Sequence, residues 1–279
     1  MAYDYKLVSV KRANGVAFAT MANPPINLIT LELSGELAQF AQEVAKDDAV
    51  RAVVLRSDDP DFWLAHFDVA AIVGFPADGI APLNQAVNDN WYHAMCETYR
   101  TMPKATIAEI NGRVGGGGSE LAMSCDMRFG ALGKTIINQP EVALGILPGG
   151  TGTQRLPRLI GRGRALEVIL GCDDLDAATA ERWGYLNRAL PPGELRPFVD
   201  KLARRIASFP APAIAAAKRA TLASDASWER GLIEESHLFQ VLLRTKQAPA
   251  AMRKFLANGG QTREGENKLG KLCEALGEQ

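Results

Sequence analysis

The hydrophobic positions in the N-terminal part of the chain follow two different periods. Apolar residues alternate with polar ones on both sides of Asn14-Gly15, the dipeptide most typical of a tight hairpin turn. Between Thr30 and Asp47 they recur every three or four positions, which predicts a helix capped by the Thr30 hydroxyl. A largely apolar run at residues 51–56 then predicts a buried strand. This order of strand, helix and strand indicates a parallel βαβ unit.

The middle of the chain continues this alternation. Further elements are expected as a short helix at 69–73, a helix at 84–102, a strand at 105–110 and a strand at 127–131. The longer helix carries an apolar stripe of Val87, Trp91, Met95 and Met102, and Pro103 ends it. The strand at 105–110 is expected to lead directly into a glycine-rich turn.

From about Ala177 the pattern is helical almost without interruption, and prolines separate the segments. Helices are expected at 177–183, 195–209, 213–223, 228–245 and 250–256. We therefore expect an α/β part over residues 1–190 and a helical part over residues 191–279.

Composition and charge exclude several classes of protein. Thirty-one basic and 32 acidic side chains give a net charge of −1, which argues against a nucleic-acid-binding protein. Four scattered cysteines and three isolated histidines indicate neither a disulfide framework nor a metal site. The N-terminus lacks the apolar segment of a signal peptide, and no apolar run is long enough to span a membrane. We expect a cytoplasmic protein without membrane partners.

The most informative stretch is Gly115–Gly118, which precedes Ser119, Glu120 and a good helix-forming run. Glycine permits close approach to the backbone, and a helix that begins there points free N–H groups at a ligand. Such a turn can bind an anion, or an oxygen that becomes anionic during a reaction. We place Glu120 in the first helical turn. The alternative is a flexible turn in which Glu120 only complements the helix dipole.

A second carboxylate, Glu141, precedes a second glycine-rich stretch at residues 145–152. The two glutamates are 21 positions apart, too far for one helix face, so only the tertiary fold could bring them together. If they meet in a partly dry site, one should keep its proton and act as an acid while the other acts as a base. The alternative is a pair of surface carboxylates.

These stretches, in this order, resemble the enoyl-CoA hydratase/isomerase superfamily, the crotonases, over nearly the whole chain. The matching segments are 23–27, 111–126, 139–141, 145–156, 231–235 and 251–255. The resemblance implies an α/β spiral of repeated ββα units with a helical C-terminal trimerisation region. It also implies a role in fatty acid metabolism, an acyl-CoA substrate, no cofactor besides the CoA of that substrate, and a homotrimer or a hexameric dimer of trimers.

The resemblance also assigns roles to single residues. The family's catalytic glutamates correspond to Glu120 and Glu141, and having both is the hydratase pattern. One would take a proton from water as it attacks Cβ of an enoyl thioester, and the other would protonate Cα. The N–H groups of Phe67 and Gly117 correspond to the oxyanion hole for the thioester oxygen. The Gly149 N–H corresponds to a position that helps hold the water.

The segment Ala65–Asp68 departs from the family's usual Ala-Gly-Ala-Asp. Phe67 brings a large ring to the oxyanion hole but keeps its N–H, and His66 would be strained if that position needs positive φ. His66 either positions substrate or water near the thioester or packs against its own loop, and we favour packing. The basic residue that often follows, associated with CoA, is replaced by Val69-Ala70.

Other candidates have simpler explanations. The basic run Arg155, Arg158, Arg162 and Arg164 could meet CoA phosphates or RNA, but we favour a solvated helical face. We expect Trp63 and Trp91 in the core or in an acyl-pocket wall. Lys218 could contact the nucleotide end of CoA, but we favour helical packing.

The sequence therefore predicts an enoyl-CoA hydratase, a lyase without metal or redox cofactor. One alternative is another reaction of the same family, such as double-bond isomerisation, thioester hydrolysis or decarboxylation. Another, from a different class, is a non-catalytic RNA- or partner-binding protein on the crotonase fold. The net charge of −1 argues against RNA.

Overall fold

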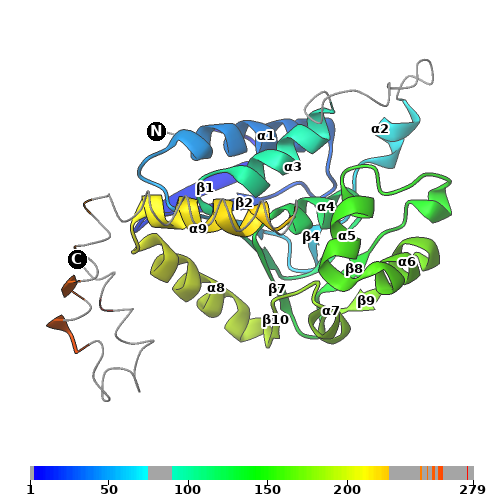
Figure 1. Cartoon of the computed structure of the whole chain (residues 1–279). Coiled ribbons are helices and arrows are strands. Elements are labelled where there is room, and N and C mark those ends of the chain that lie inside the picture. Colours follow the sequence, from blue (N-terminus) through cyan, green and yellow to red (C-terminus); the bar gives the residue numbers. More distant parts are fainter. Residues whose placement is uncertain are drawn as a thin grey trace.

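A computed structural model shows a mixed α/β architecture built on two sheets (Figure 1). It describes residues 3–74 and 90–225, together with positions 246, 250, 253–254, 257–259 and 275. The strands are β1 (Val8–Ala13), β2 (Val16–Met21), β3 (Ala52–Ser57), β4 (Phe62–Leu64), β5 (Ala105–Ile110), β6 (Arg113–Gly115), β7 (Met127–Ala131), β8 (Ile136–Asn138), β9 (Leu175–Asp176) and β10 (Arg188–Leu190). The helices are α1 (Leu31–Lys46), α2 (Val69–Val73), α3 (Trp91–Thr101), α4 (Gly116–Ser124), η2 (Val142–Leu144, a 3₁₀ turn), α5 (Gly152–Ile160), α6 (Arg162–Gly171), α7 (Ala177–Trp183), α8 (Pro192–Ala207) and α9 (Ala211–Ala223).

The N-terminal elements form as predicted. β1 and β2 are antiparallel, and Asn14 and Gly15 between them both adopt positive φ, at 51° and 75°. The Thr30 hydroxyl accepts the Leu33 N–H at 3.2 Å and so caps α1. β3 then pairs with β2 in parallel, which completes the βαβ unit.

The larger sheet has the order β1-β2-β3-β5-β7-β10, and its two faces bury two separate apolar clusters. Along β2, Val16 and Phe18 face α8, whereas Ala17 and Ala19 face the opposite cluster. That second cluster includes residues of α1, α3 and α4, and Figure 1 shows α1 and α3 side by side. The smaller sheet has the order β4-β6-β8-β9 and carries α4 against it.

The glycine-rich stretch differs from the prediction. β5 does not lead directly into it, because the short strand β6 intervenes, and α4 already begins at Gly116. Glu120 therefore lies in the second helical turn. Close packing explains why glycines form the first turn: a Cβ on Gly118 would lie 2.6 Å from the Leu64 carbonyl oxygen of β4.

The apolar stripe predicted for α3 is confirmed at Met95 and Met102, which are buried, but not at Trp91. The buried side chains of this helix are Tyr92, Met95, Cys96 and Tyr99, whereas Trp91 is 46% exposed. The Asn90 side chain accepts the N–H groups of residues 92 and 93, so the helix begins at Trp91. The earlier part of the predicted helix, residues 84–89, lies outside the described residues.

Toward the C-terminus, α7, α8 and α9 match the predicted segments to within a few residues. The two last predicted helices, at 228–245 and 250–256, fall largely outside the described residues. α8 packs Leu195, Val199, Ala203 and Ala207 onto the larger sheet. The division of the chain at residue 190 and the trimerisation role of the C-terminal part stay predictions. Among the described helices, none is both long and apolar enough to cross a membrane.

Ion pairs of Glu109 in β5 help attach α8 to the larger sheet, and they predict how two substitutions change stability. The Glu109 carboxylate is 2% exposed and pairs with Arg56 at 2.8 Å and with Arg196 at 2.9 Å. The Arg56 side chain is 10% exposed, whereas that of Arg196 is 58% exposed. Glu109→Gln removes one acidic partner of the buried Arg56, which keeps its pair with Asp200 of α8, so it should lower the free energy of unfolding by roughly 2 kcal/mol. Arg196→Ala should cost less than about 1 kcal/mol.

Denaturant unfolding of both variants beside the wild type measures these differences. Equal losses in the two variants would contradict the buried role assigned to Glu109.

Candidate active site

Glu120 projects from α4 into the loop that precedes α5. Its side chain is 3% exposed, and Oε1 accepts the N–H groups of Gly150 at 2.8 Å and Gly152 at 2.7 Å. A Cβ on Gly150 would lie 2.3 Å from Glu120 Oε2. Glycine at position 150 is therefore what lets the loop backbone reach this carboxylate.

Glu141 follows β8 and is also buried, at 8% exposure. Its Oε1 would lie 2.9 Å from a Cβ on Gly116, the first residue of α4, so its carboxylate faces the start of that helix. Its Oε2 is buried and accepts no hydrogen bond from the described residues. The fold thus brings both glutamates to α4, and the alternative of two surface carboxylates is wrong.

Burial changes the acidity of both groups. Desolvation raises the pKa of Glu120 to about 7, and the Glu141 charge adds to this increase. The amide donors of Gly152 and Gly150 and the charge of Arg155 lower the pKa of Glu120 and so oppose it. Burial also raises the pKa of Glu141 above its ordinary value. The site therefore holds two carboxyl groups that ionise less readily than exposed ones.

The first turn of α4 lies against the segment that contains His66 and Phe67. A Cβ on Gly117 would be 3.4 Å from the Phe67 Cβ, and one on Gly116 would be 3.2 Å from the His66 Cβ. The backbone of this segment is fixed on Ile29, whose N–H donates to the His66 carbonyl at 2.9 Å. The structure thus places Phe67 and Gly117, the two predicted oxyanion-hole residues, next to each other.

His66 does not have positive φ, so the expected backbone strain is absent. Its Nδ1 lies 2.8 Å from the Phe67 carbonyl oxygen and must carry the hydrogen, because a carbonyl only accepts. The ring is therefore held by its own loop, as expected of a packing role. The predicted role of the Gly149 N–H stays a prediction, and the Gly149 carbonyl accepts from His93 Nε2 at 2.7 Å.

Tyr92 is a site residue that the sequence analysis missed. Its hydroxyl donates to the Gly117 carbonyl at 2.7 Å, and its ring occupies the space where a Cβ of Gly150 would be. It also makes an edge contact with Phe67, with ring centroids 6.0 Å apart. Phe67 contacts Trp91 at the same centroid distance, so Trp91 belongs to this aromatic cluster and not to the core. The signal was the apolar stripe of α3, which contains Tyr92 and not Trp91.

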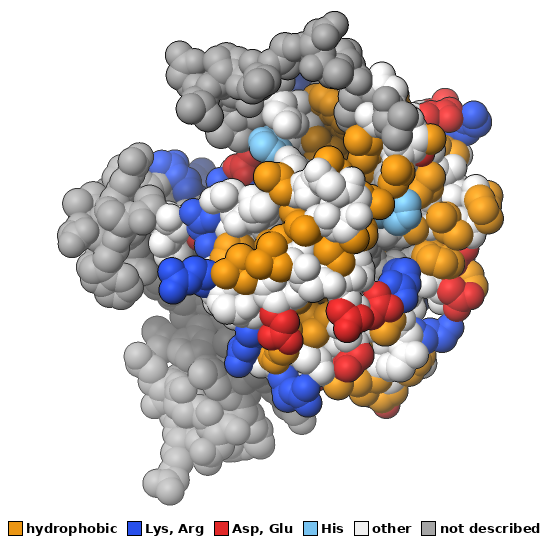
Figure 2. All heavy atoms as spheres, turned by 90° about the vertical axis from the view of Figure 1, so that its right-hand side faces the viewer, with side chains coloured by type: hydrophobic (Ala, Val, Ile, Leu, Met, Phe, Trp, Pro, Cys, Tyr) orange, Lys and Arg blue, Asp and Glu red, His pale blue; other side chains and the backbone are white. Residues whose placement is uncertain are grey.

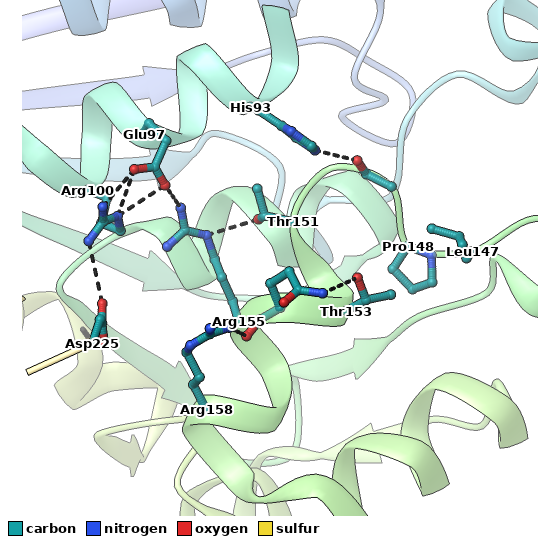
Figure 3. A pocket seen from close by; sticks show the side chains of 12 residues that line it. His93, Glu97, Arg100, Leu147, Pro148, Thr151, Thr153, Arg155, Arg158 and Asp225 are labelled. Carbon is teal, nitrogen blue, oxygen red and sulfur yellow. Dashed lines mark hydrogen bonds and ion pairs between the residues drawn. The ribbon is translucent and has the colours of Figure 1, made fainter. Parts of the chain in front are cut away.

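The prediction of a solvated face for the basic run on α5 and α6 is wrong at Arg155. Arg158, Arg162 and Arg164 are exposed, as expected of a solvated face. Arg155 is only 14% exposed and pairs with Glu97 of α3 (Figure 3). Lys218 is buried by helical packing, where it pairs with Asp126 at 2.9 Å.

The surface beside Glu141 is apolar. The loop that follows it exposes Leu144, Ile146 and Leu147, between 44% and 59%. Figure 2 shows hydrophobic side chains spread over this face of the molecule, the right-hand side of Figure 1. Trp63, by contrast, is fully buried in the core, as predicted.

Comparison with known proteins extends the match along most of the chain. The family model for enoyl-CoA hydratase/isomerase matches residues 11–261. A crotonyl-CoA hydratase of Syntrophomonas wolfei is 31% identical over 260 residues, which cover 92% of this chain and 96% of that protein. A Rhizobium meliloti protein named "Probable enoyl-CoA hydratase" is 33% identical over 256 residues, 91% and 96% of the two chains. The crystal structure of an enoyl-CoA hydratase from Bacillus anthracis has a TM-score of 0.81 at 27% identity and covers 90% of this chain and 96% of that one.

The raised pKa of Glu120 predicts how stability depends on pH. The folded state holds this proton up to about pH 7, whereas the unfolded chain releases it near the ordinary value of 4.5. The free energy of unfolding should therefore fall by about 3 kcal/mol as the pH rises through this window. Glu120→Gln cannot ionise, so it should be more stable than the wild type at pH 8 and about equal at pH 4.

Denaturant midpoints of both proteins across this pH range test the prediction. A smaller slope should remain in the variant because the pKa of Glu141 is raised too. Equal slopes in the two proteins would show that Glu120 does not hold its proton.

The close approach at Gly150 yields a second prediction. Gly150→Ala would place a Cβ 2.3 Å from Glu120 Oε2 and 2.7 Å from the Tyr92 ring, and it should cost about 2 kcal/mol of unfolding free energy. Gly163→Ala in α6 is the matched control, because its Cβ would meet nothing within 4 Å. Alanine favours a helix over glycine, so the control should unfold at the same or a higher denaturant concentration. A control as destabilised as Gly150→Ala would refute the steric argument.

Proposed function

Because this chain belongs to the enoyl-CoA hydratase/isomerase family, we propose that it is an enoyl-CoA hydratase, which adds water across the 2,3-double bond of an enoyl-CoA thioester. The observation that carries the proposal is the pair of buried carboxylates, Glu120 on α4 and Glu141 facing Gly116, the first residue of that helix. Relatives of similar length named as hydratases support the reaction class.

The two carboxyl groups have the properties that such a reaction needs. A group with a pKa near 7 both accepts and donates protons at neutral pH, and burial raises the pKa of Glu120 to about 7. Glu141 Oε2 has no donor among the described residues, so it can accept a hydrogen bond from a water molecule. One glutamate removes a proton from the water that attacks Cβ, and the other delivers a proton to Cα.

The start of α4 supplies the electrostatic part of the reaction. The first N–H groups of a helix have no partner within the helix, and its dipole favours a negative charge there. We assign the N–H groups of Gly117 and Phe67 to the thioester oxygen, on which charge develops as the Cα–Cβ bond reacts. Each such donor is worth about 3 kcal/mol to the transition state.

The rings of Phe67, Trp91 and Tyr92 form an apolar wall beside this position. We assign this wall to the acyl chain. In this proposal the substrate brings its own CoA, no further cofactor takes part, and the protein works as a cytoplasmic homotrimer or dimer of trimers.

Glutamine substitutions test the two-carboxylate proposal. Loss of absorbance of the conjugated thioester reports the hydration of crotonyl-CoA. Glu120→Gln and Glu141→Gln should each lower the rate by about a thousandfold, because each removes one proton-transfer group. Glu167→Gln, on the exposed side of α6, is the matched control and should keep the wild-type rate.

Two results would contradict the proposal. Full activity of Glu141→Gln would indicate a reaction that needs one carboxylate, such as double-bond isomerisation. Binding of crotonyl-CoA to the wild type without any loss of absorbance would show that the family fold serves a different reaction here.

A further inference from the structure

We propose that Arg155 is a positioning residue that holds Thr151 in an unfavourable backbone conformation, so that the N–H groups of Gly150 and Gly152 converge on Glu120. Its kinetic consequences rest on the proposed hydratase function, whereas its effect on Glu120 does not.

The backbone at Thr151 is strained. Its φ is 115° with ψ −7°, a region that β-branched residues rarely adopt. Such conformations cost free energy and persist only where the surroundings enforce them. Thr151 lies between the two glycines whose N–H groups bind Glu120, so its conformation determines where both donors point.

The Thr151 side chain shows what enforces this conformation. Threonine just before a helix usually accepts an N–H of the first turn, but the Thr151 hydroxyl makes no such bond. It accepts instead from Arg155 Nε at 2.9 Å, one turn further along α5 (Figure 3). Arg155 thus binds the loop through the Thr151 hydroxyl.

Arg155 is itself anchored to α3. Its Nη2 pairs with Glu97, whose carboxylate is bound from the other side by Arg100 at 2.7 Å. α3 also provides His93, which donates to the Gly149 carbonyl at 2.7 Å. These side chains are among those that line a cavity of about 550 Å³, and Figure 3 shows them together. The loop is therefore tied to α3 at both ends while its N–H groups bind Glu120.

The charge of Arg155 acts on Glu120 as well. The ionisable groups that act on Glu120 come from α3, from the loop after β8, from α5 and from the turn after α7: Tyr92, Cys96, Glu141, Arg155 and Tyr185. Arg155 contributes the positive charge in this set and lowers the pKa of Glu120, against burial and Glu141. Loss of that charge should therefore raise the pKa of Glu120 above about 7.

Arg155→Met and Arg158→Met make a matched pair. Both remove one guanidinium from α5 and from the same cavity, but Arg158 donates to the Gln154 carbonyl of its own helix and pairs with no carboxylate among the described residues. Arg155→Met should lower kcat for crotonyl-CoA roughly a hundredfold with little change in KM, because the misplaced loop disturbs Glu120 and not binding. Arg158→Met should stay within about twofold of the wild type.

Two further variants separate positioning from simple stabilisation of the fold. Glycine adopts positive φ without strain, so in a Thr151→Gly background Arg155→Met should cost about tenfold less in kcat than in the wild type. Arg155→Lys keeps the charge without the planar fork, so kcat should still fall, and the pKa of Glu120 should rise less than in Arg155→Met because only the contribution of the misplaced N–H groups is lost. If Arg155 only stabilised the packing of α3 and α5, the two losses would be the same in both backgrounds.

Infrared titration of the protonated Glu120 carboxyl, identified by its absence in Glu120→Gln, gives a readout independent of turnover. We expect its midpoint to move to higher pH in Arg155→Met and to stay unchanged in Arg158→Met. An unchanged midpoint in Arg155→Met would overturn the inference. If the wild type does not hydrate crotonyl-CoA but the midpoint rises in Arg155→Met and, by a smaller step, in Arg155→Lys, the proposed function fails and the positioning role of Arg155 stands.

Discussion

The rest of the site depends on how closely the backbone of residues 150–152 approaches the Glu120 carboxylate. The N–H groups of Gly150 and Gly152 both donate to Glu120 Oε1, and a Cβ on either glycine would come within 3 Å of that carboxyl group. Burial disfavours the ionised acid, whereas the two donors favour it. The balance leaves the pKa of Glu120 at about 7. Paired acid and base catalysis at neutral pH requires a group of this kind.

Much of the fold could be predicted from the sequence because the relevant interactions are local. The Asn14-Gly15 turn and the Thr30 cap each involve residues within a few positions of one another. The meeting of Glu120, Glu141 and residues 150–152 is not local, and their spacing alone left a surface pair of carboxylates open. The family resemblance pointed to Glu120 and Glu141, and both are buried in the structure. It gave no information on the groups that hold these side chains in place.

The errors have identifiable physical causes. A helix with aromatic residues at both 91 and 92 offers two possible stripes, and only the cap at Asn90 and the packing against α4 show that Tyr92 points inward. Arg155 and Arg158 look alike in the sequence, because the partner that buries Arg155 lies on another helix. For Tyr92 a local cap and a distant partner, Gly117, set the orientation, whereas for Arg155 the deciding partner, Glu97, is distant along the chain.

The most direct test of the two-carboxylate mechanism is the fate of the oxygen of water. Crotonyl-CoA would be incubated with the wild type in ¹⁸O-labelled water, and the products would be read by mass spectrometry. The account predicts a hydroxyacyl-CoA that carries the label on its acyl group, with the thioester intact, and about a thousandfold slower formation of this product by Glu120→Gln. Free CoA with the label in a released carboxylate, or a CoA thioester of unchanged mass, would contradict it.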